Sequence, residues 1–113
     1  VAMIVKGSRG DAQPAVALAL GLKKAGFHMK LLVNKEAAEF AQSFPLEVAS
    51  YPWAWGEAGG SAGFFPQRAD GREQSCIYEA MRDFKPHLLL YHKRSFLEAW
   101  VLEEQLRIPT VQF

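Results

Sequence analysis

Five consecutive residues near the start of the chain, Gly7-Ser8-Arg9-Gly10-Asp11, combine charged side chains with the backbone freedom of a polar binding loop. The two glycines permit a tight turn and a close approach of the backbone to a ligand. An apolar run, Val1–Val5, precedes the loop and a long apolar stretch, residues 12–25, follows it, which predicts a strand, a loop and a helix. The free N–H groups at the start of such a helix favour an anion. We therefore predict that this loop is the active-site corner, suited to a phosphate or an oxyanion.

Arg9 and Asp11 each admit a chemical and a structural interpretation. The Asp11 carboxylate is available for acid–base chemistry, or it can cap the helix that follows. These two roles conflict in part, because N–H groups that donate to the carboxylate lower its pKa and make it a weaker base. Arg9 can face phosphate or leaving-group charge, or it can be solvated or bridge to another domain. Gly7 and Gly10 shape the loop whatever it binds.

Two well-known nucleotide-binding patterns are not met in this loop. The pattern G-x-G-x-x-G requires glycine where Arg9 and Ala12 stand, and the acidic residue expected at the end of the second strand is replaced by Val33-Asn34. The P-loop also fails, because no Gly-Lys-Ser/Thr follows the glycines. A dinucleotide-dependent enzyme is therefore disfavoured.

The elements that must hold the loop alternate between strand and helix. Crossovers of this length favour a parallel sheet with helices on both faces, with the strand order 3-2-1-4-5. Helix 12–25 is apolar over much of its circumference, so we expect it to be largely buried. Asn34 is expected to cap the next helix, and Asp70-Gly-Arg-Glu73 is a capping-box pattern. The predicted strands are 1–5, 27–33, 46–49, 87–91 and 108–113, and the predicted helices are 12–25, 35–43, 71–84 and 95–106.

A second polar turn, His92-Lys93-Arg94-Ser95, follows the fourth predicted strand. In the predicted strand order this turn and the first loop flank one crevice at the point where the strand order reverses. His92 and Ser95 are therefore candidate residues for contact with a ligand in this cleft. The alternative is a solvated basic turn with a serine in a second capping box, Ser95-Phe-Leu-Glu98.

Residues 51–70 form a long glycine-rich segment in which Tyr51 is followed by four large aromatic side chains, among them Trp53 and Trp55. Long loops in compact domains are often functional, and aromatic residues can line an apolar ligand site. Trp53 and Trp55 are therefore candidate residues of an apolar ligand pocket. The alternative is that they fold back on their own domain or meet another one.

Length and composition fit one globular domain of 113 residues, with 50% hydrophobic residues and a net charge of +1. This balance gives no indication of nucleic-acid binding. Cys76 is the single cysteine, which excludes an internal disulfide and a cysteine-built metal site and fits a reducing, cytoplasmic compartment. No stretch approaches the roughly 20 apolar residues of a membrane span. Because the chain opens on a strand without an initiator Met and stops on another strand, we expect a fragment of a larger protein.

Three stretches of the chain resemble one enzyme family. The first is Gly7-Ser-Arg-Gly-Asp-Ala-Gln-Pro14 with the helix that ends in Ala25-Gly26, and the others are Lys85-Pro-His-Leu-Leu-Leu-Tyr91 and Leu106-Arg-Ile-Pro-Thr-Val111. Together they resemble the family-28 glycosyltransferases, with the sterol glucosyltransferases and the glycopeptide-antibiotic glycosyltransferases as the nearest kinds. The chain departs from the family at Phe27, where His is frequent, and at Arg107, where Gly is usual.

This resemblance implies that residues 1–113 are the N-terminal, acceptor-binding domain of a GT-B fold, a Rossmann-like α/β domain. The donor-binding C-terminal domain would be absent, so the isolated chain is expected to be inactive and to expose an apolar surface that invites association. The implied reaction transfers a hexosyl group from a nucleotide-diphosphate sugar such as UDP-glucose to a hydroxyl of a lipophilic acceptor such as a sterol. Neither a metal nor another cofactor is implied.

The resemblance also implies roles for the first loop. Asp11 would act as the general base or orient the acceptor hydroxyl, and Gly7, Ser8, Arg9 and Gly10 would form the loop that faces the donor phosphates. Contact with a membrane surface would be peripheral, to reach a lipid acceptor. The alternative to this enzyme is a non-catalytic Rossmann-like module that binds a hydrophobic ligand or a protein partner.

Overall fold

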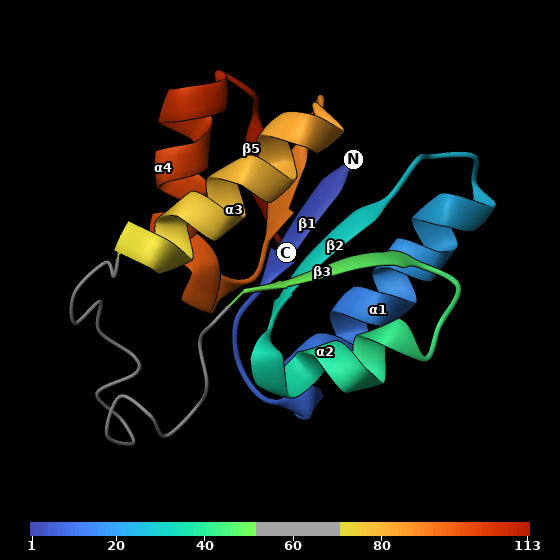
Figure 1. Ribbon diagram of the computed structural model, residues 1–113. Helices are drawn as coiled ribbons and strands as arrows, with labels where there is room; N and C mark the ends of the chain where they lie inside the picture. Colours follow the sequence, from blue (N-terminus) through green and yellow to red (C-terminus); the bar gives the residue numbers. More distant parts are fainter. Residues whose placement is uncertain (52–70) are drawn as a thin grey trace.

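A parallel five-stranded sheet in the order β3-β2-β1-β4-β5 forms the centre of the molecule (Figure 1). The computed structural model describes residues 1–51 and 71–113, and only the backbone of residues 71–76. The strand order and the α/β class are those predicted from the crossovers. The strands are β1 Ala2–Val5, β2 Lys30–Asn34, β3 Glu47–Tyr51, β4 Leu89–Tyr91 and β5 Thr110–Gln112, and the helices are α1 Arg9–Lys24, α2 Lys35–Gln42, α3 Gly71–Phe84 and α4 Phe96–Leu106.

The helices cover the two faces of the sheet in pairs. Figure 1 shows α1 and α2 on one face and α3 and α4 on the other. Successive residues of β1 alternate between these layers: Met3 and Val5 pack with the α1 side, whereas Ala2 and Ile4 pack with the α3 and α4 side. All four residues of β1 are buried, as expected for a central strand that is covered on both faces.

Helix α1 begins at Arg9, within the predicted loop, and is less buried than its leucines suggest. Its buried residues are Val16 and three alanines, whereas Leu18 remains 38% exposed. The prediction of a largely buried helix is therefore wrong. The small alanine side chains face the sheet and bring the helix close to it, so the leucines lie at the margins of the contact.

The carboxyl ends of the strands are aligned at one edge of the sheet. Val5 pairs with Val33 and Ile4 with Tyr91, and Asn34 pairs with Tyr51. The third strand therefore extends further than predicted, and its last residue, Tyr51, donates from its buried hydroxyl to the Val5 carbonyl at 3.1 Å. The residues that follow β1, β2 and β4 all emerge at this edge.

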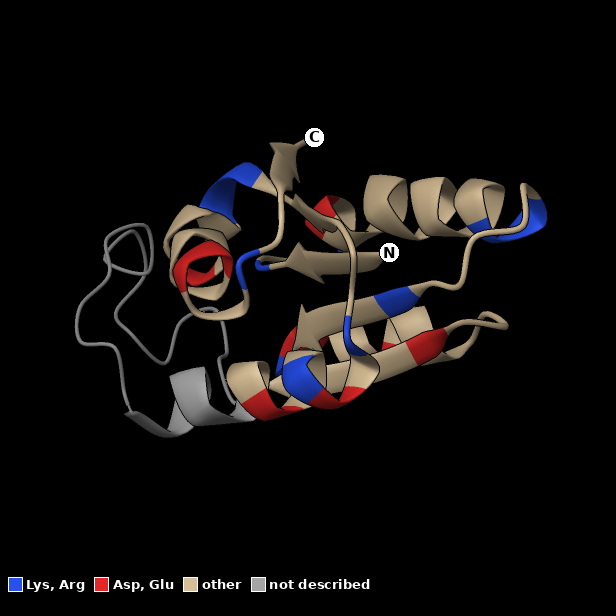
Figure 2. Ribbon diagram, turned by 90° about the horizontal axis from the view of Figure 1, so that it is seen from above, with Lys and Arg blue, Asp and Glu red and all other residues tan. Residues whose placement is uncertain are grey.

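Some predictions fall outside the described residues, namely the 51–70 segment beyond Tyr51, with Trp53 and Trp55, and the capping box that begins at Asp70. Figure 2 shows acidic and basic residues interspersed on the helices. None of the helices within the described ranges combines the length and the apolar character needed to cross a lipid bilayer.

Candidate functional site

The first loop folds around the Asp11 carboxylate. The Ser8 backbone N–H donates to Asp11 Oδ2 at 2.9 Å, and the Ser8 hydroxyl lies 3.1 Å from the same oxygen. Ser8 occupies the N-cap position of α1, and Asp11 is the third residue of the helix. Asp11 is therefore not the N-cap as predicted, but its carboxylate reaches back from inside the first turn to the N-cap residue.

Gly7 is the glycine on which this loop depends. Its φ is +148°, and an added Cβ atom would lie 2.2 Å from Asp11 Oδ2, so any other residue would displace the carboxylate. The buried Gly7 N–H donates to Asn34 Oδ1 at 3.0 Å, which ties the loop to the end of β2. Gly10 differs: it lies in the first turn of α1, and an added Cβ atom would make an ordinary 3.6 Å contact with the Ser8 hydroxyl.

The turn after β4 brings two basic side chains to the same carboxylate. His92 Nε2 lies 3.8 Å from Asp11 Oδ1, and Arg94 Nη1 lies 3.6 Å from Asp11 Oδ2. The structure thus places His92 beside Asp11 across the predicted crevice. The sequence placed Arg94 in the turn that faces the crevice, but it did not single Arg94 out as a partner of Asp11.

The environment of this cluster lowers the pKa values of both Asp11 and His92. Partial burial by itself raises the pKa of the Asp11 carboxyl, but the Ser8 N–H, the Arg94 guanidinium, the Ser8 hydroxyl and His92 outweigh it and lower that pKa below its usual value. Burial lowers the pKa of His92, helped by Arg94 and Lys93 and opposed by Asp11 and the Lys6 backbone. A carboxylate with a lowered pKa is a weaker base, but it remains an ionised hydrogen-bond acceptor down to a lower pH.

Ser95 and Glu98 do not form the predicted capping box. A 3₁₀ turn, Lys93–Ser95, leads into α4, and Ser95 makes no side-chain cap there. Glu98 instead pairs with Lys6, with 2.7 Å between Oε1 and Nζ. Ser95 is fully buried, and its hydroxyl has no hydrogen-bond partner among the described residues. This burial favours a structural position for Ser95 over contact with an acceptor.

Arg9 points toward α2 and not toward Asp11. Its guanidinium carbon lies 4.6 Å from the centre of the Phe40 ring, a cation–π geometry. The donor-phosphate role predicted for Arg9 would require this exposed side chain to leave Phe40. Of the predicted loop residues, Gly7, Ser8 and Asp11 are therefore drawn together, and Arg9 lies to one side.

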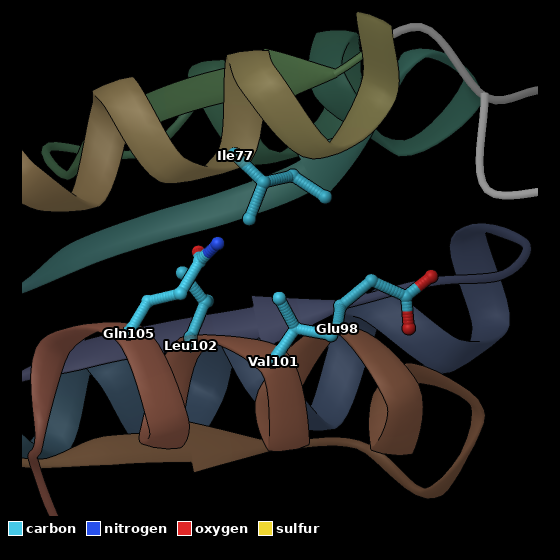
Figure 3. Close-up of a pocket in the computed structure, with 5 residues that line it drawn as sticks. All are labelled: Ile77, Glu98, Val101, Leu102 and Gln105. Carbon is cyan, nitrogen blue, oxygen red and sulfur yellow. The ribbon is translucent and has the colours of Figure 1, made fainter. Parts of the chain in front are cut away.

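A small recess between α3 and α4 adds residues that sequence reasoning missed. Figure 3 shows Ile77 of α3 directed toward one face of α4, where Glu98, Val101, Leu102 and Gln105 complete the lining. Glu98 also accepts a hydrogen bond from Lys6, the residue before Gly7. The sequence does show the helical spacing of these residues along α4. That spacing cannot identify a recess, because residues of an ordinary core contact have the same spacing. Within residues 1–51 and 77–113 no group of three His, Cys, Asp or Glu side chains is arranged to hold a metal.

Comparison with known proteins gives this site a context. The model of the glycosyltransferase family 28 N-terminal domain matches residues 1–111. The chain belongs to this family. No curated protein matches the chain in sequence.

Solved structures share the fold. A glycosyltransferase of kitacinnamycin superposes with a TM-score of 0.80 and 20% identity, and the calicheamicin glycosyltransferase CalG4 with 0.76 and 18%. In both cases the match covers 98% of this chain and 29% of the other. The glycosyltransferase VinC, solved in complex with DTDP, gives a TM-score of 0.76 at 12% identity, over 99% of this chain and 34% of VinC. The chain therefore has the fold of the N-terminal part of these enzymes and spans about a third of their length.

Proposed function

We propose that this chain supplies the acceptor-binding half of a glycosyltransferase that moves a hexosyl group from a nucleotide-diphosphate sugar, UDP-glucose-like, to a hydroxyl of a lipophilic acceptor such as a sterol. The observation that carries the proposal is the Asp11 carboxylate, held by Ser8 and Arg94 at the carboxyl edge of the sheet in a family-28 domain. The DTDP complex of VinC supports a nucleotide-linked donor. The C-terminal domain that would hold most of this donor is not in this chain.

In this mechanism Asp11 positions and deprotonates the acceptor hydroxyl. Among the described residues, the hydrogen bonds to this carboxylate are made to Oδ2. Its other oxygen, Oδ1, can therefore accept a hydrogen bond from the hydroxyl group of the sugar acceptor. As the acceptor oxygen forms a bond to the anomeric carbon, the bond from that carbon to the diphosphate oxygen breaks and the proton passes to Asp11. Because the pKa of Asp11 is lowered, orientation of the hydroxyl contributes more than basicity before the new bond forms.

The lipophilic acceptor in this proposal rests on the resemblance to the sterol glucosyltransferases. The recess between α3 and α4, lined by Ile77, Val101 and Leu102, is too small to hold such an acceptor. An enzyme of this kind in the cytoplasm would meet a sterol at a membrane surface, so peripheral membrane contact is part of the proposal.

The test is an assay of the complete protein that contains this chain. Release of UDP from UDP-glucose is measured with a panel of sterols and polar alcohols, for the wild type and for Asp11→Asn. We expect transfer to sterols and a fall in kcat of about 100-fold or more in Asp11→Asn, because a positioned acid–base group contributes about 10²–10⁴ to the rate.

Glu39→Gln is the matched control, because it makes the same carboxylate-to-amide change at an exposed position of α2. Unchanged activity in Asp11→Asn would contradict the proposed role. So would a fall in the free energy of unfolding large enough to account for the whole loss of activity. Binding of a hydrophobic ligand without transfer from any donor would favour the non-catalytic module instead.

A further inference from the structure

Asn34 occupies a helix-capping position but does not use its side chain as a cap. It is the last residue of β2 and the N-cap of α2, where an asparagine side chain usually accepts from the first N–H groups of the helix. In this structure Asn34 makes no side-chain cap and is fully buried. The predicted cap is therefore wrong, and the buried amide requires another explanation.

The Asn34 side chain instead holds the first loop. Its Oδ1 accepts the Gly7 N–H at 3.0 Å, across 27 positions of the sequence. Gly7 precedes Ser8, whose N–H donates to Asp11 Oδ2 at 2.9 Å. Asn34, Gly7, Ser8 and Asp11 therefore form one continuous series of contacts from the end of β2 to the candidate catalytic carboxylate.

We propose that Asn34 is a positioning residue of the transfer reaction, fixing the Gly7 peptide and, through Ser8, the orientation of the Asp11 carboxylate. This inference rests on the proposed function for its effect on catalysis, but the physical link from Asn34 to Asp11 can be measured without it. Asn34 is not a catalytic residue in this account, because its acceptor oxygen is used by the backbone of the loop.

The amide suits this position better than the acidic residue that dinucleotide-binding domains place at the end of the second strand. A carboxylate would also accept the Gly7 N–H, but it would add a buried negative charge near Asp11, which would raise the pKa of Asp11. The Asn34 Nδ2 group is buried without a hydrogen-bond partner among the described residues, which is unfavourable. Of the two polar atoms of the Asn34 amide, Oδ1 is therefore the one that makes a hydrogen bond in the structure.

The test compares Asn34→Ala, which removes the acceptor, with Asn34→Asp, which keeps an acceptor oxygen, in the complete protein. Three quantities are measured: the Gly7 amide resonance with ¹⁵N-glycine labelling, the pKa of Asp11 from its carboxyl ¹³C resonance, and kcat and KM for sugar transfer. Lys35→Ala, at the exposed neighbouring position, is the matched control.

In Asn34→Ala we expect a displaced Gly7 resonance, a higher pKa of Asp11 and a kcat lower by about 10- to 100-fold, with both KM values within about twofold of the wild type. The pKa rises because Asp11 loses the fixed Ser8 N–H while Arg94 and His92 still face it. Asn34→Asp should keep the Gly7 resonance near its wild-type position and should be more active than Asn34→Ala. A role in stability alone would leave the pKa of Asp11 in the folded protein unchanged.

An unchanged Gly7 resonance and an unchanged pKa of Asp11 in folded Asn34→Ala would overturn the inference, as would an unchanged kcat. If Asn34→Ala does not fold, Asn34→Ser, which removes the amide with a smaller loss of volume, is measured in the same way. The failure of the proposed function has a different signature: Asp11→Asn would remain active while Asn34→Ala still raised the pKa of Asp11.

Discussion

Asp11 shows how the contacts of one residue can serve a structural role and a chemical role together. Its carboxylate accepts the Ser8 N–H and lies near both Arg94 and His92, and these neighbours lower its pKa although burial opposes them. The same contacts that stabilise the start of α1 thus keep the carboxylate ionised and oriented. At the residue scale, the cap and the proposed catalytic role are therefore compatible if Asp11 acts mainly by positioning the acceptor hydroxyl.

The pKa of His92 tests this electrostatic coupling. Burial lowers that pKa from 6.5, whereas the charge of Asp11 raises it. We expect Asp11→Asn to lower the pKa of His92 further, as measured by NMR titration of the imidazole ring. Unfolded His92 takes up a proton as the pH falls below 6.5, whereas folded His92 in the variant does so only at a lower pH. The variant should therefore lose more stability than the wild type as the pH falls from 6.5 toward the pKa of folded His92.

Urea unfolding at about pH 7.5 and about pH 5 measures that stability difference. Glu39→Gln removes an exposed carboxylate on α2 and should leave the His92 titration unchanged. A His92 pKa that stays constant or rises in Asp11→Asn would show that the two groups are not coupled in solution.

Gly7 and Gly21 give predictions of opposite sign for the same substitution. Gly7→Ala places a methyl group 2.2 Å from Asp11 Oδ2 at a φ of +148°, so we expect a loss of stability of about 1–3 kcal/mol. Gly21 lies in α1 with nothing within 4 Å of an added Cβ atom, so Gly21→Ala should stabilise the chain by about 0.5–1 kcal/mol. Urea unfolding measures both, and a stabilising Gly7→Ala would contradict the loop geometry.

At the scale of the elements, the sequence predicts the order of the strands well because crossover length and handedness leave few topologies. Alternating strands and helices were sufficient for β3-β2-β1-β4-β5. Element ends were less predictable where long-range contacts decide them. Phe27 was expected within β2 but is 51% exposed, and the strand begins at Lys30, where pairing with β1 and β3 begins.

The sequence predicted which loops form the candidate site, but it did not predict the side-chain contacts between them. The glycines and the strand order placed Asp11 and His92 at one edge of the sheet. Local capping patterns then misassigned Asn34 and Glu98, because both side chains find partners far away in the sequence, at Gly7 and Lys6. A capping box describes only neighbouring residues, so it cannot show when a tertiary contact competes for the same oxygen.

The pair of Lys6 and Glu98 ties the end of β1 to α4 and should stabilise the fold measurably. The two side chains are only 13% and 10% exposed and lie 2.7 Å apart. A double-mutant cycle with Lys6→Met and Glu98→Gln is expected to give a coupling energy of about 1–3 kcal/mol in urea unfolding. Lys30 and Glu47, 3.6 Å apart with Glu47 half exposed, are the control and should couple by less than about 1 kcal/mol. Equal coupling energies in the two cycles would show that burial of the charged side chains does not determine the strength of the pair.

At the scale of the whole molecule, the chain is well packed around β1 and open on its α4 side. Both clusters of buried residues include β1, so the centre of the sheet is covered on both faces. On α4, by contrast, Phe96 and Trp100 are 53% and 56% exposed. Because they are four positions apart on a helix, the two exposed aromatic side chains lie on the same face of α4.

This surface should make the isolated chain associate with itself at high concentration. Burial of an aromatic side chain is worth about 1.5–3 kcal/mol, so removing two of them should weaken association by at least about tenfold. We expect sedimentation velocity to show concentration-dependent association of the 113-residue chain and its loss in Phe96→Ser/Trp100→Gln. Phe27→Ser is the control, because Phe27 is equally exposed, at 51%, but lies between α1 and β2. Association that survives the double variant, or that Phe27→Ser weakens as much, would place the contact on another face of the molecule.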